Sequence, residues 1–188
     1  MRDAQKFRAY RADYQFHEML KPLGCNRQFD SLGDIQSYVY GVHRWVRTNR
    51  KRVRGLMNRR IPEDAPEIIA RPRGDTSTAF DLAWKIEIAS REKVRSFHWT
   101  ERMILHELAH LYVGCDQQHG PVWAAAYLQL VRQWLGKAAA DLLVGRWKRH
   151  RVRYNMPRPS RRKKLSPTER AAFVERMKRA REAACQRT

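Results

Sequence analysis

The chain has 188 residues, of which 43% are apolar. This length suits one compact domain with an appendage and is too short for two domains of ordinary size. Lys and Arg total 39 against 19 Asp and Glu, which gives a net charge of +20. An excess of this size favours a polyanionic partner, most commonly nucleic acid, over a charge that only keeps the surface hydrated.

The cysteines and the apolar stretches indicate the compartment. Cys25, Cys115 and Cys185 form no Cys-x-x-Cys pair, which argues against a disulfide framework and against a cysteine-based zinc knuckle. No run approaches the roughly 18 apolar residues that span a bilayer, and the first residues lack the apolar stretch of a secretion signal. We therefore expect a cytoplasmic protein with no membrane partner, acting in the host cytoplasm if it is phage-encoded.

Two helices are predicted in the first part of the chain. The first covers about residues 3–20 and ends at Pro22 and Gly24, two residues that rarely continue a helix. The second begins after Ser31, and Asp34 follows three residues later, which resembles a capping box with Asp in place of Glu. Its apolar residues recur at helical spacings: Ile35, Val39, Val42 and Val46.

The middle of the chain is interrupted by prolines and predicts three short strands. Residues 67–70 and 78–81 are the weaker candidates. Residues 84–89 alternate apolar and polar side chains, which is typical of a strand with one buried face. Ahead of these strands, residues 44–60 are heavily basic, which suits either a phosphate contact or the solvated end of a helix.

Helices return after the strands. Thr100 is the expected N-cap of a helix that ends before Gly114. Pro121 opens a second helix that reaches about Leu135, and a short helix over residues 138–144 follows it. Together these elements predict an α+β fold that is mostly helical and has a small β-sheet.

The basic residues are concentrated at the end of the chain. Residues 146–188 hold 16 basic and 3 acidic residues, and residues 1–145 hold 23 and 16, so the two parts carry +13 and +7. We therefore expect a folded domain over residues 1–145 and a basic tail over 146–188. Ser166, Pro167 and Glu169 together predict a terminal helix in the tail. Residues 146–181 are the expected nucleic-acid contact, although a solvated tail without a partner remains an alternative.

The motif that carries chemistry is His106-Glu107-Leu108-Ala109-His110, an HExxH sequence. Two histidines four residues apart lie on one helical face, so both imidazoles can reach one zinc ion. The metal would lower the pKa of a bound water toward about 7, and Glu107 would accept its proton as the water attacks a carbonyl. The alternative is a pair of core or surface histidines without a metal, but such polar groups on an apolar helix are costly when unpaired.

A catalytic zinc usually has three protein ligands and one position open for water. His119 is the favoured third ligand, because it follows the glycine-terminated turn after the motif and Gly120 relaxes the backbone beside it. Asp116 and Cys115 are rival ligands in the same loop. We therefore predict a zinc site of His106, His110 and His119.

HELAH followed by HGPVW resembles the HExxH…HGxxF/W signature of SprT-like metallopeptidases, which are minimal zincins with helices over a small sheet. Residues 2–5 and 31–39 are also similar to a group of actinobacterial and phage metallohydrolases. The specific part spans about residues 84–135. The resemblance implies zinc bound by His106, His110 and His119 with Glu107 as general base. It further implies a zincin-like metallohydrolase domain over residues 1–145.

The resemblance also bears on partners. It implies a polypeptide substrate laid along an edge strand at residues 84–89. Some SprT-like proteases digest proteins attached to DNA, which would give the basic tail a purpose. The chain departs from those relatives because it has no Cys-rich zinc ribbon after the motif, so the tail would have to replace it.

Three functions follow from these observations. The first is a zinc metallopeptidase held on nucleic acid by its basic tail. The second is a nucleic-acid-binding protein with a structural zinc, in which Asp116 or Cys115 closes the coordination sphere and Glu107 is dispensable. The third is a metallohydrolase acting on a small amide or ester. The oligomeric state does not follow from the sequence.

Overall fold

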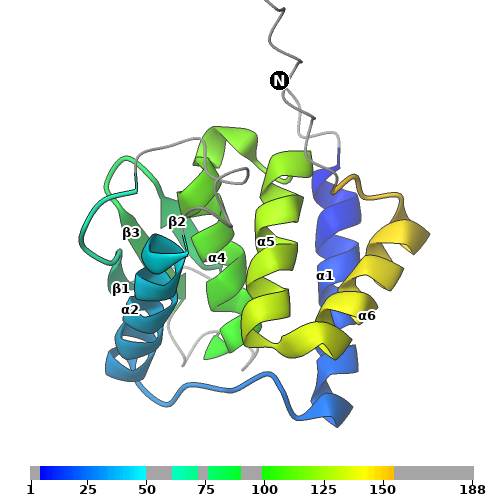
Figure 1. The fold of residues 1–188 in the computed structure, drawn as a ribbon, viewed down its shortest axis with the longest axis horizontal. Helices are drawn as coiled ribbons and strands as arrows, with labels where there is room; N and C mark the ends of the chain where they lie inside the picture. The colour runs from blue at the N-terminus through cyan, green and yellow to red at the C-terminus, as the bar shows by residue number, and fades with distance from the viewer. Residues whose placement is uncertain (1–4, 50–60, 72–75, 90–98, 155–188) are drawn as a thin grey trace, which may run out of the picture. The chain divides into compact units, whose positions relative to one another are not determined.

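The computed structural model describes residues 5–49, 61–71, 76–89 and 99–154 (Figure 1). Within these ranges the chain forms five α-helices and a three-stranded sheet, so the α+β, mostly helical fold expected from the sequence is confirmed at this level. The first compact unit ends at Met156. The predicted terminal helix of the tail lies outside the described residues.

The helices arrange themselves around α4, which carries the HExxH motif. The five are α1 (Lys6–Leu20), α2 (Leu32–Thr48), α4 (Glu101–Val113), α5 (Pro121–Trp134) and α6 (Gly136–His150). α4 packs against α5 on one side and against the sheet on the other, and α6 packs against both α5 and α1 (Figure 1). The motif helix is therefore enclosed by other elements, and its histidines lie in the interior.

The sheet is small and its strand order is β1-β3-β2. The strands are β1 (Glu67–Arg71), β2 (Thr78–Phe80) and β3 (Lys85–Ala89). β3 pairs in parallel with β1 and antiparallel with β2, so it is the middle strand of the three described. The expectation of an edge strand at residues 84–89 was therefore wrong. The strand next to α4 is β2.

Ser31 is the N-cap of α2, as predicted, but no hydrogen bond from its backbone N–H to Asp34 completes a capping box in the described residues. The Asp34 N–H donates to the Ser31 hydroxyl at 3.1 Å, and that hydroxyl donates to the Asp34 carboxylate at 2.9 Å. The four apolar residues at helical spacing are all fully buried: Ile35, Val39, Val42 and Val46. The apolar residues that recur at helical spacing in α2 therefore form the face of the helix that packs into the core.

The start of α4 is stabilised from a distant part of the chain. Thr100 is the N-cap residue, as expected, but its side chain makes no capping hydrogen bond. The Arg102 N–H donates instead to the Asn26 side-chain oxygen at 3.0 Å, and the Glu101 N–H donates to the Arg27 carbonyl at 2.9 Å. The segment after α1 thus accepts hydrogen bonds from two backbone N–H groups of the first turn of α4, which have no partner within the helix.

The helix α6 is longer than predicted. A short helix over residues 138–144 and a basic connector from Arg146 were expected, but α6 continues to His150. The reason is Trp147, which is fully buried and lies 6.2 Å from Tyr127 and 5.4 Å from Tyr154, measured between ring centroids. The predicted domain boundary at residue 145 therefore falls inside a helix that packs on the core.

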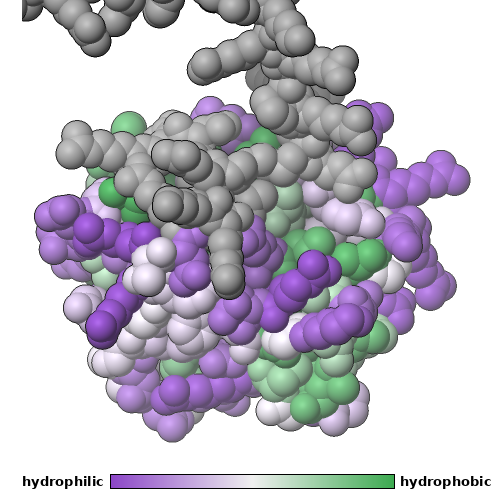
Figure 2. Space-filling model, viewed as in Figure 1, coloured by the Kyte–Doolittle hydropathy of each residue, from purple (hydrophilic) through white to green (hydrophobic). Residues whose placement is uncertain are grey.

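The described helices include none that is long and apolar enough to cross a membrane. The largest fully buried side chains include Trp123, Trp147, Tyr112 and Phe16, whereas several aromatic side chains of α1 and α2 are exposed. The face drawn in Figure 2 carries mainly hydrophilic residues, with smaller apolar areas between them. The core therefore accounts for most of the apolar content of the described chain.

We predict that Trp147→Ala lowers the free energy of unfolding by about 3–5 kcal/mol, because it opens a cavity under α6. Urea denaturation followed by circular dichroism measures this change. Lys148→Ala is the matched control on the exposed side of the same turn, and we expect a change below about 0.5 kcal/mol. Equal, small effects of the two substitutions would mean that the basic segment does begin at residue 146.

Candidate metal centre

The structure brings His106, His110 and His119 together in the interior. One donor atom from each histidine lies within 4.8 Å of those of the other two, and all three residues are buried. The ring centroids are 5.2, 5.4 and 4.8 Å apart. Zinc held at its usual distance by three imidazole nitrogens would need them about 3.4 Å apart. Shifts of about 1 Å in the side chains would therefore bring them to a common ion.

His119 reaches this place through a tight loop after α4. Gly114 ends the helix with φ 94°, and Gln118 has φ 45°. A Cβ on Gly120 would lie 2.9 Å from the Gln117 carbonyl oxygen, so only glycine fits there without a shift. The Cys115 N–H donates to the Asp81 carboxylate at 3.1 Å, which fastens the loop to the turn after β2.

Trp123, on α5, supports all three histidines at once. It is fully buried, and its ring centroid lies 4.7 Å from those of His106 and His119 and 5.2 Å from that of His110. Its indole N–H donates to the His106 carbonyl at 3.4 Å. A single large side chain therefore fills the space behind the cluster and limits the rotation of the three imidazoles.

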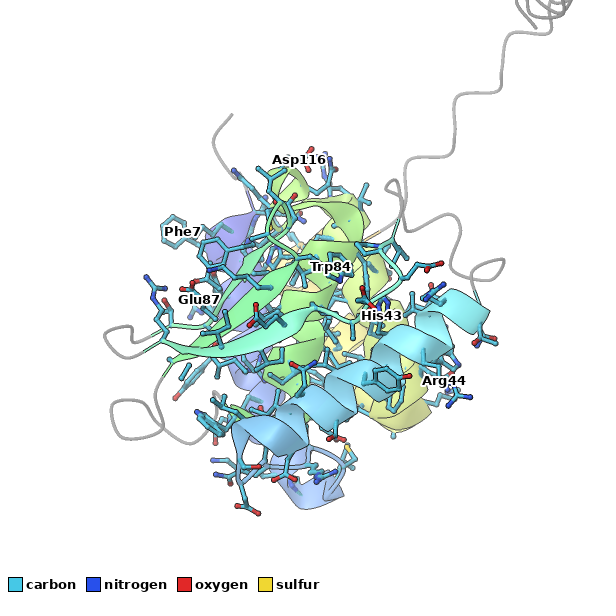
Figure 3. All side chains as sticks on the ribbon, turned by 90° about the vertical axis from the view of Figure 1, so that its left-hand side faces the viewer. Phe7, His43, Arg44, Trp84, Glu87 and Asp116 are labelled. Carbon is cyan, nitrogen blue, oxygen red and sulfur yellow. The ribbon has the colours of Figure 1, made fainter. Side chains whose placement is uncertain are left out.

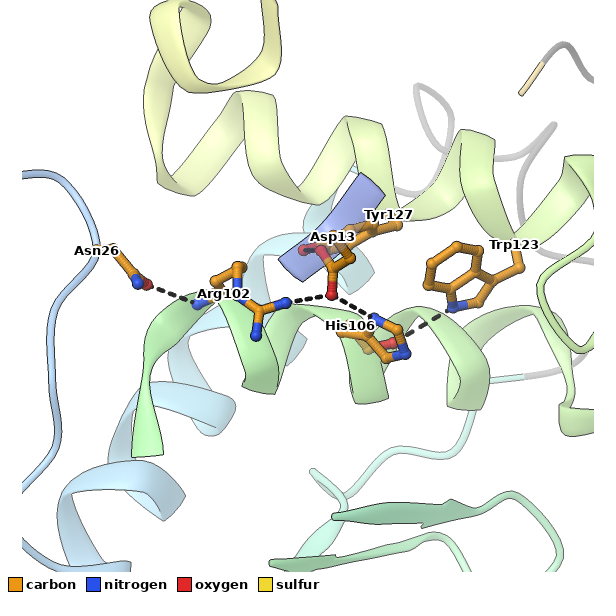
Figure 4. A network of polar contacts seen from close by, with 6 residues as sticks. All are labelled: Asp13, Asn26, Arg102, His106, Trp123 and Tyr127. Atoms are coloured by element: carbon orange, nitrogen blue, oxygen red, sulfur yellow. Dashed lines mark hydrogen bonds and ion pairs between the residues drawn. The ribbon is translucent and has the colours of Figure 1, made fainter. Parts of the chain in front are cut away.

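Asp13 orients the first histidine from α1 (Figure 4). Its carboxylate lies 3.3 Å from His106 Nδ1, accepts a hydrogen bond from the Tyr127 hydroxyl at 2.8 Å, and is bonded to the Arg102 guanidinium. Burial alone would raise the pKa of Asp13, but the Arg102 charge and the His106 ring hold it well below its usual value. An ionised carboxylate there keeps the proton on Nδ1 and leaves Nε2 of His106 available as a ligand.

The histidines suit a divalent cation such as zinc. Burial lowers the pKa of His110 well below its usual value, and the neighbouring His106 and His119 lower it further. A neutral imidazole offers the lone pair that a metal needs. Three imidazole nitrogen donors, one with a carboxylate behind it, are a donor set that zinc accepts readily.

Glu107 lies beside this cluster and is buried. Burial raises the pKa of Glu107 to about 7, although the His106 ring and a hydrogen bond from the Ala79 backbone lower it in part. Ala79 belongs to β2, and its carbonyl accepts from the Cys115 thiol at 3.4 Å. The Ala79 backbone therefore faces α4, away from β3.

The two rival ligands lie elsewhere. Asp116 is exposed, at the rim of the molecule in Figure 3, and its carboxylate accepts from the Gln117 side chain at 3.1 Å. The thiol of Cys115 points to the Ala79 carbonyl. In the described part of the chain, neither side chain belongs to the group that could hold an ion.

Sequence reasoning missed the residues that support the cluster. Trp123 belongs to the HGPVW sequence but was not predicted to contact the histidines, and Asp13 lies outside any motif, 93 residues before His106 along the chain. Gln5 was missed as well: its side-chain amide donates to the His119 carbonyl and to the Arg153 carbonyl, the latter at 3.2 Å. The only available signal was a charged residue, Asp13, on the otherwise apolar face of α1.

Comparisons with protein-family models, with curated proteins and with solved structures found no match for this chain. The function must therefore be argued from the site itself.

We predict that Asp13→Asn weakens zinc binding about 10- to 100-fold, because His106 loses the carboxylate that fixes its ring. Competition with a fluorescent zinc chelator measures the affinity, at a temperature where circular dichroism confirms the fold. Asp116→Asn is the matched control and should leave the affinity unchanged. A loss of zinc in Asp116→Asn but not in Asp13→Asn would show that Asp116 is a ligand and that Asp13 does not support the site.

Proposed function

We propose that the protein is a zinc-dependent metallopeptidase of the minimal zincin type, similar to the SprT-like enzymes. The observation that carries the proposal is the convergence of His106, His110 and His119 next to the buried carboxylate of Glu107. Hydrolysis needs a base beside the metal, and Glu107 supplies a buried carboxylate directly after the first histidine of the cluster.

Each residue of the site would have one role in hydrolysis. His106, His110 and His119 would hold the zinc, and Asp13 would keep His106 in the required tautomer. When bound, zinc supplies a Lewis acid that lowers the pKa of water and polarises a carbonyl. Glu107 would take the proton from the attacking water and pass it to the leaving amine.

The alternative is a structural zinc in a nucleic-acid-binding protein. It requires a fourth protein ligand, and the rivals Asp116 and Cys115 are turned toward other partners within the described residues. The peptidase proposal is therefore favoured. Because neither Cys25 nor Cys115 forms a disulfide, a reducing compartment such as the cytoplasm is the proposed place of action.

Nucleic acid remains part of the proposal, as the partner of the basic segment 146–181. Five basic residues of its described part follow one another closely on and after α6: Arg146, Lys148, Arg149, Arg151 and Arg153. The pKa of His150 is lowered by burial and then by three arginines, one of which, Arg11, comes from α1. Trp147 is buried and Tyr154 packs against it, so phosphate contacts rather than base stacking would supply the affinity.

We predict that the wild type and Glu107→Gln each retain about one zinc per chain, and that Glu107→Gln lowers kcat on a peptide substrate about 10²- to 10⁴-fold. His119→Ala should lose zinc or bind it much more weakly, because it removes one of three ligands. Metal content by inductively coupled plasma mass spectrometry and peptide cleavage by mass spectrometry give the two readouts. A wild type that holds no zinc after metal-replete purification would overturn the proposal.

For the tail, we predict salt-dependent binding to DNA. Replacing Arg161 and Arg162 with Gln should lower the slope of log K against log salt by about 1.8, because each lost phosphate contact contributes about 0.9. Fluorescence anisotropy on a duplex at several salt concentrations measures the slope. The control, Arg132 and Lys137 both replaced with Gln, removes the same charge from exposed positions of the folded unit. Equal slopes for the two variants would mean that DNA binding depends on the net charge of the protein and not on the arginines of the tail.

A further inference from the structure

A cavity of about 380 Å³ lies beside the candidate metal centre, between α1 and α4. Its lining includes Tyr10, Tyr14, His17, Met103, His106 and Glu107. The cavity opens to the surface past Tyr10 and Tyr14, which are about half exposed. Its volume falls within the range of ligand pockets, so a side chain of a ligand could enter it.

An exposed aromatic stripe on α1 runs along this cavity. We use that name for Phe7, Tyr10 and Tyr14, which lie three and four residues apart and so share one helical face. Their exposed fractions are 85%, 46% and 54%. Phe7 points away from the ribbon at the edge of the molecule (Figure 3). Tyr10 and Tyr14 line the cavity itself. A contiguous row of exposed aromatic side chains is typical of a binding surface.

Apart from Glu107, the charged side chains that line the cavity compensate each other. Arg102 and Asp13 form a buried ion pair, so neither has a charge to offer to a ligand. His17 lies on the same wall, and burial followed by the Arg102 charge lowers its pKa, which keeps it neutral at pH 7. An acidic side chain that entered would lose its hydration without gaining a counter-charge from these residues, because Arg102 is already paired with Asp13.

We propose that this cavity and the aromatic stripe bind a polypeptide substrate through a large apolar or aromatic side chain next to the scissile bond. The inference rests on the proposed peptidase function. Its position follows from the lining, because His106 and Glu107 belong to it and the ring of Tyr10, a further lining residue, lies 4.7 Å from that of His119. A side chain such as Phe or Leu would contact Tyr10, Tyr14 and Met103.

Burial of such a side chain should favour it over a small residue at this position about 10- to 100-fold in kcat/KM. The test is the cleavage pattern of the full zinc-loaded chain on a mixed peptide library, read by mass spectrometry. We expect Phe, Tyr, Leu or Met beside the cleaved bond in the wild type. Met103→Trp fills the cavity and should shift the preference to Gly and Ala. Tyr14→Lys, at a half-exposed position, should raise cleavage beside Asp and Glu.

Leu82→Trp is the matched control, because Leu82 is 95% exposed and does not line the cavity; its pattern should equal that of the wild type. Cleavage without a preference, or the same preference in all four proteins, would overturn the inference and leave the peptidase proposal intact. If zinc is bound but nothing is cleaved, the peptidase proposal fails. NMR titration with N-acetyl-phenylalanine amide then decides: binding that Met103→Trp abolishes supports the cavity, and no binding overturns it.

Discussion

The buried carboxylate of Asp13 joins the three helices from which the site is built. It comes from α1, bonds to Arg102 and His106 on α4, and accepts a hydrogen bond from Tyr127 on α5. An uncompensated Arg102 charge in the interior would cost several kcal/mol, about 3–5 when one partner of such a pair is removed. The same contact that fixes the first histidine therefore also holds α1 in place. Fold and site cannot be changed separately at this position.

The enclosure by α1, α5 and β2 sets the electrostatics of the site. His110 is kept neutral by burial, while burial raises the pKa of Glu107 to about 7. Polar groups held in a dry interior are costly unless they are paired with one another or with an ion. Evolution retains such an arrangement mainly where the groups perform chemistry. This argument supports a metal centre independently of any sequence motif.

The sequence was informative where the determinants are local. The HExxH spacing, the N-cap at Ser31 and the glycine at the end of α4 each act over a few residues, so their patterns could be read directly. Asp13 could not be predicted as the partner of His106, because the contact depends on how α1 packs against α4. The length of α6 was missed for a similar reason, since the burial of Trp147 outweighs the basic residues around it. The middle position of β3 depends on a crossover that alternation of residues does not encode.

Two kinds of recognition are separated in the proposed mode of action. Coulombic attraction to a polyanion acts over about 8–10 Å at physiological salt and does not distinguish one peptide from another. The cavity beside Glu107 carries compensated charges and an aromatic wall, so it would distinguish side chains by size and polarity at contact distance. The basic segment would therefore decide where the protein resides, and the cavity would decide which bond is cut. Because the two act on different atoms of the complex, salt should weaken the first and leave the second almost unchanged.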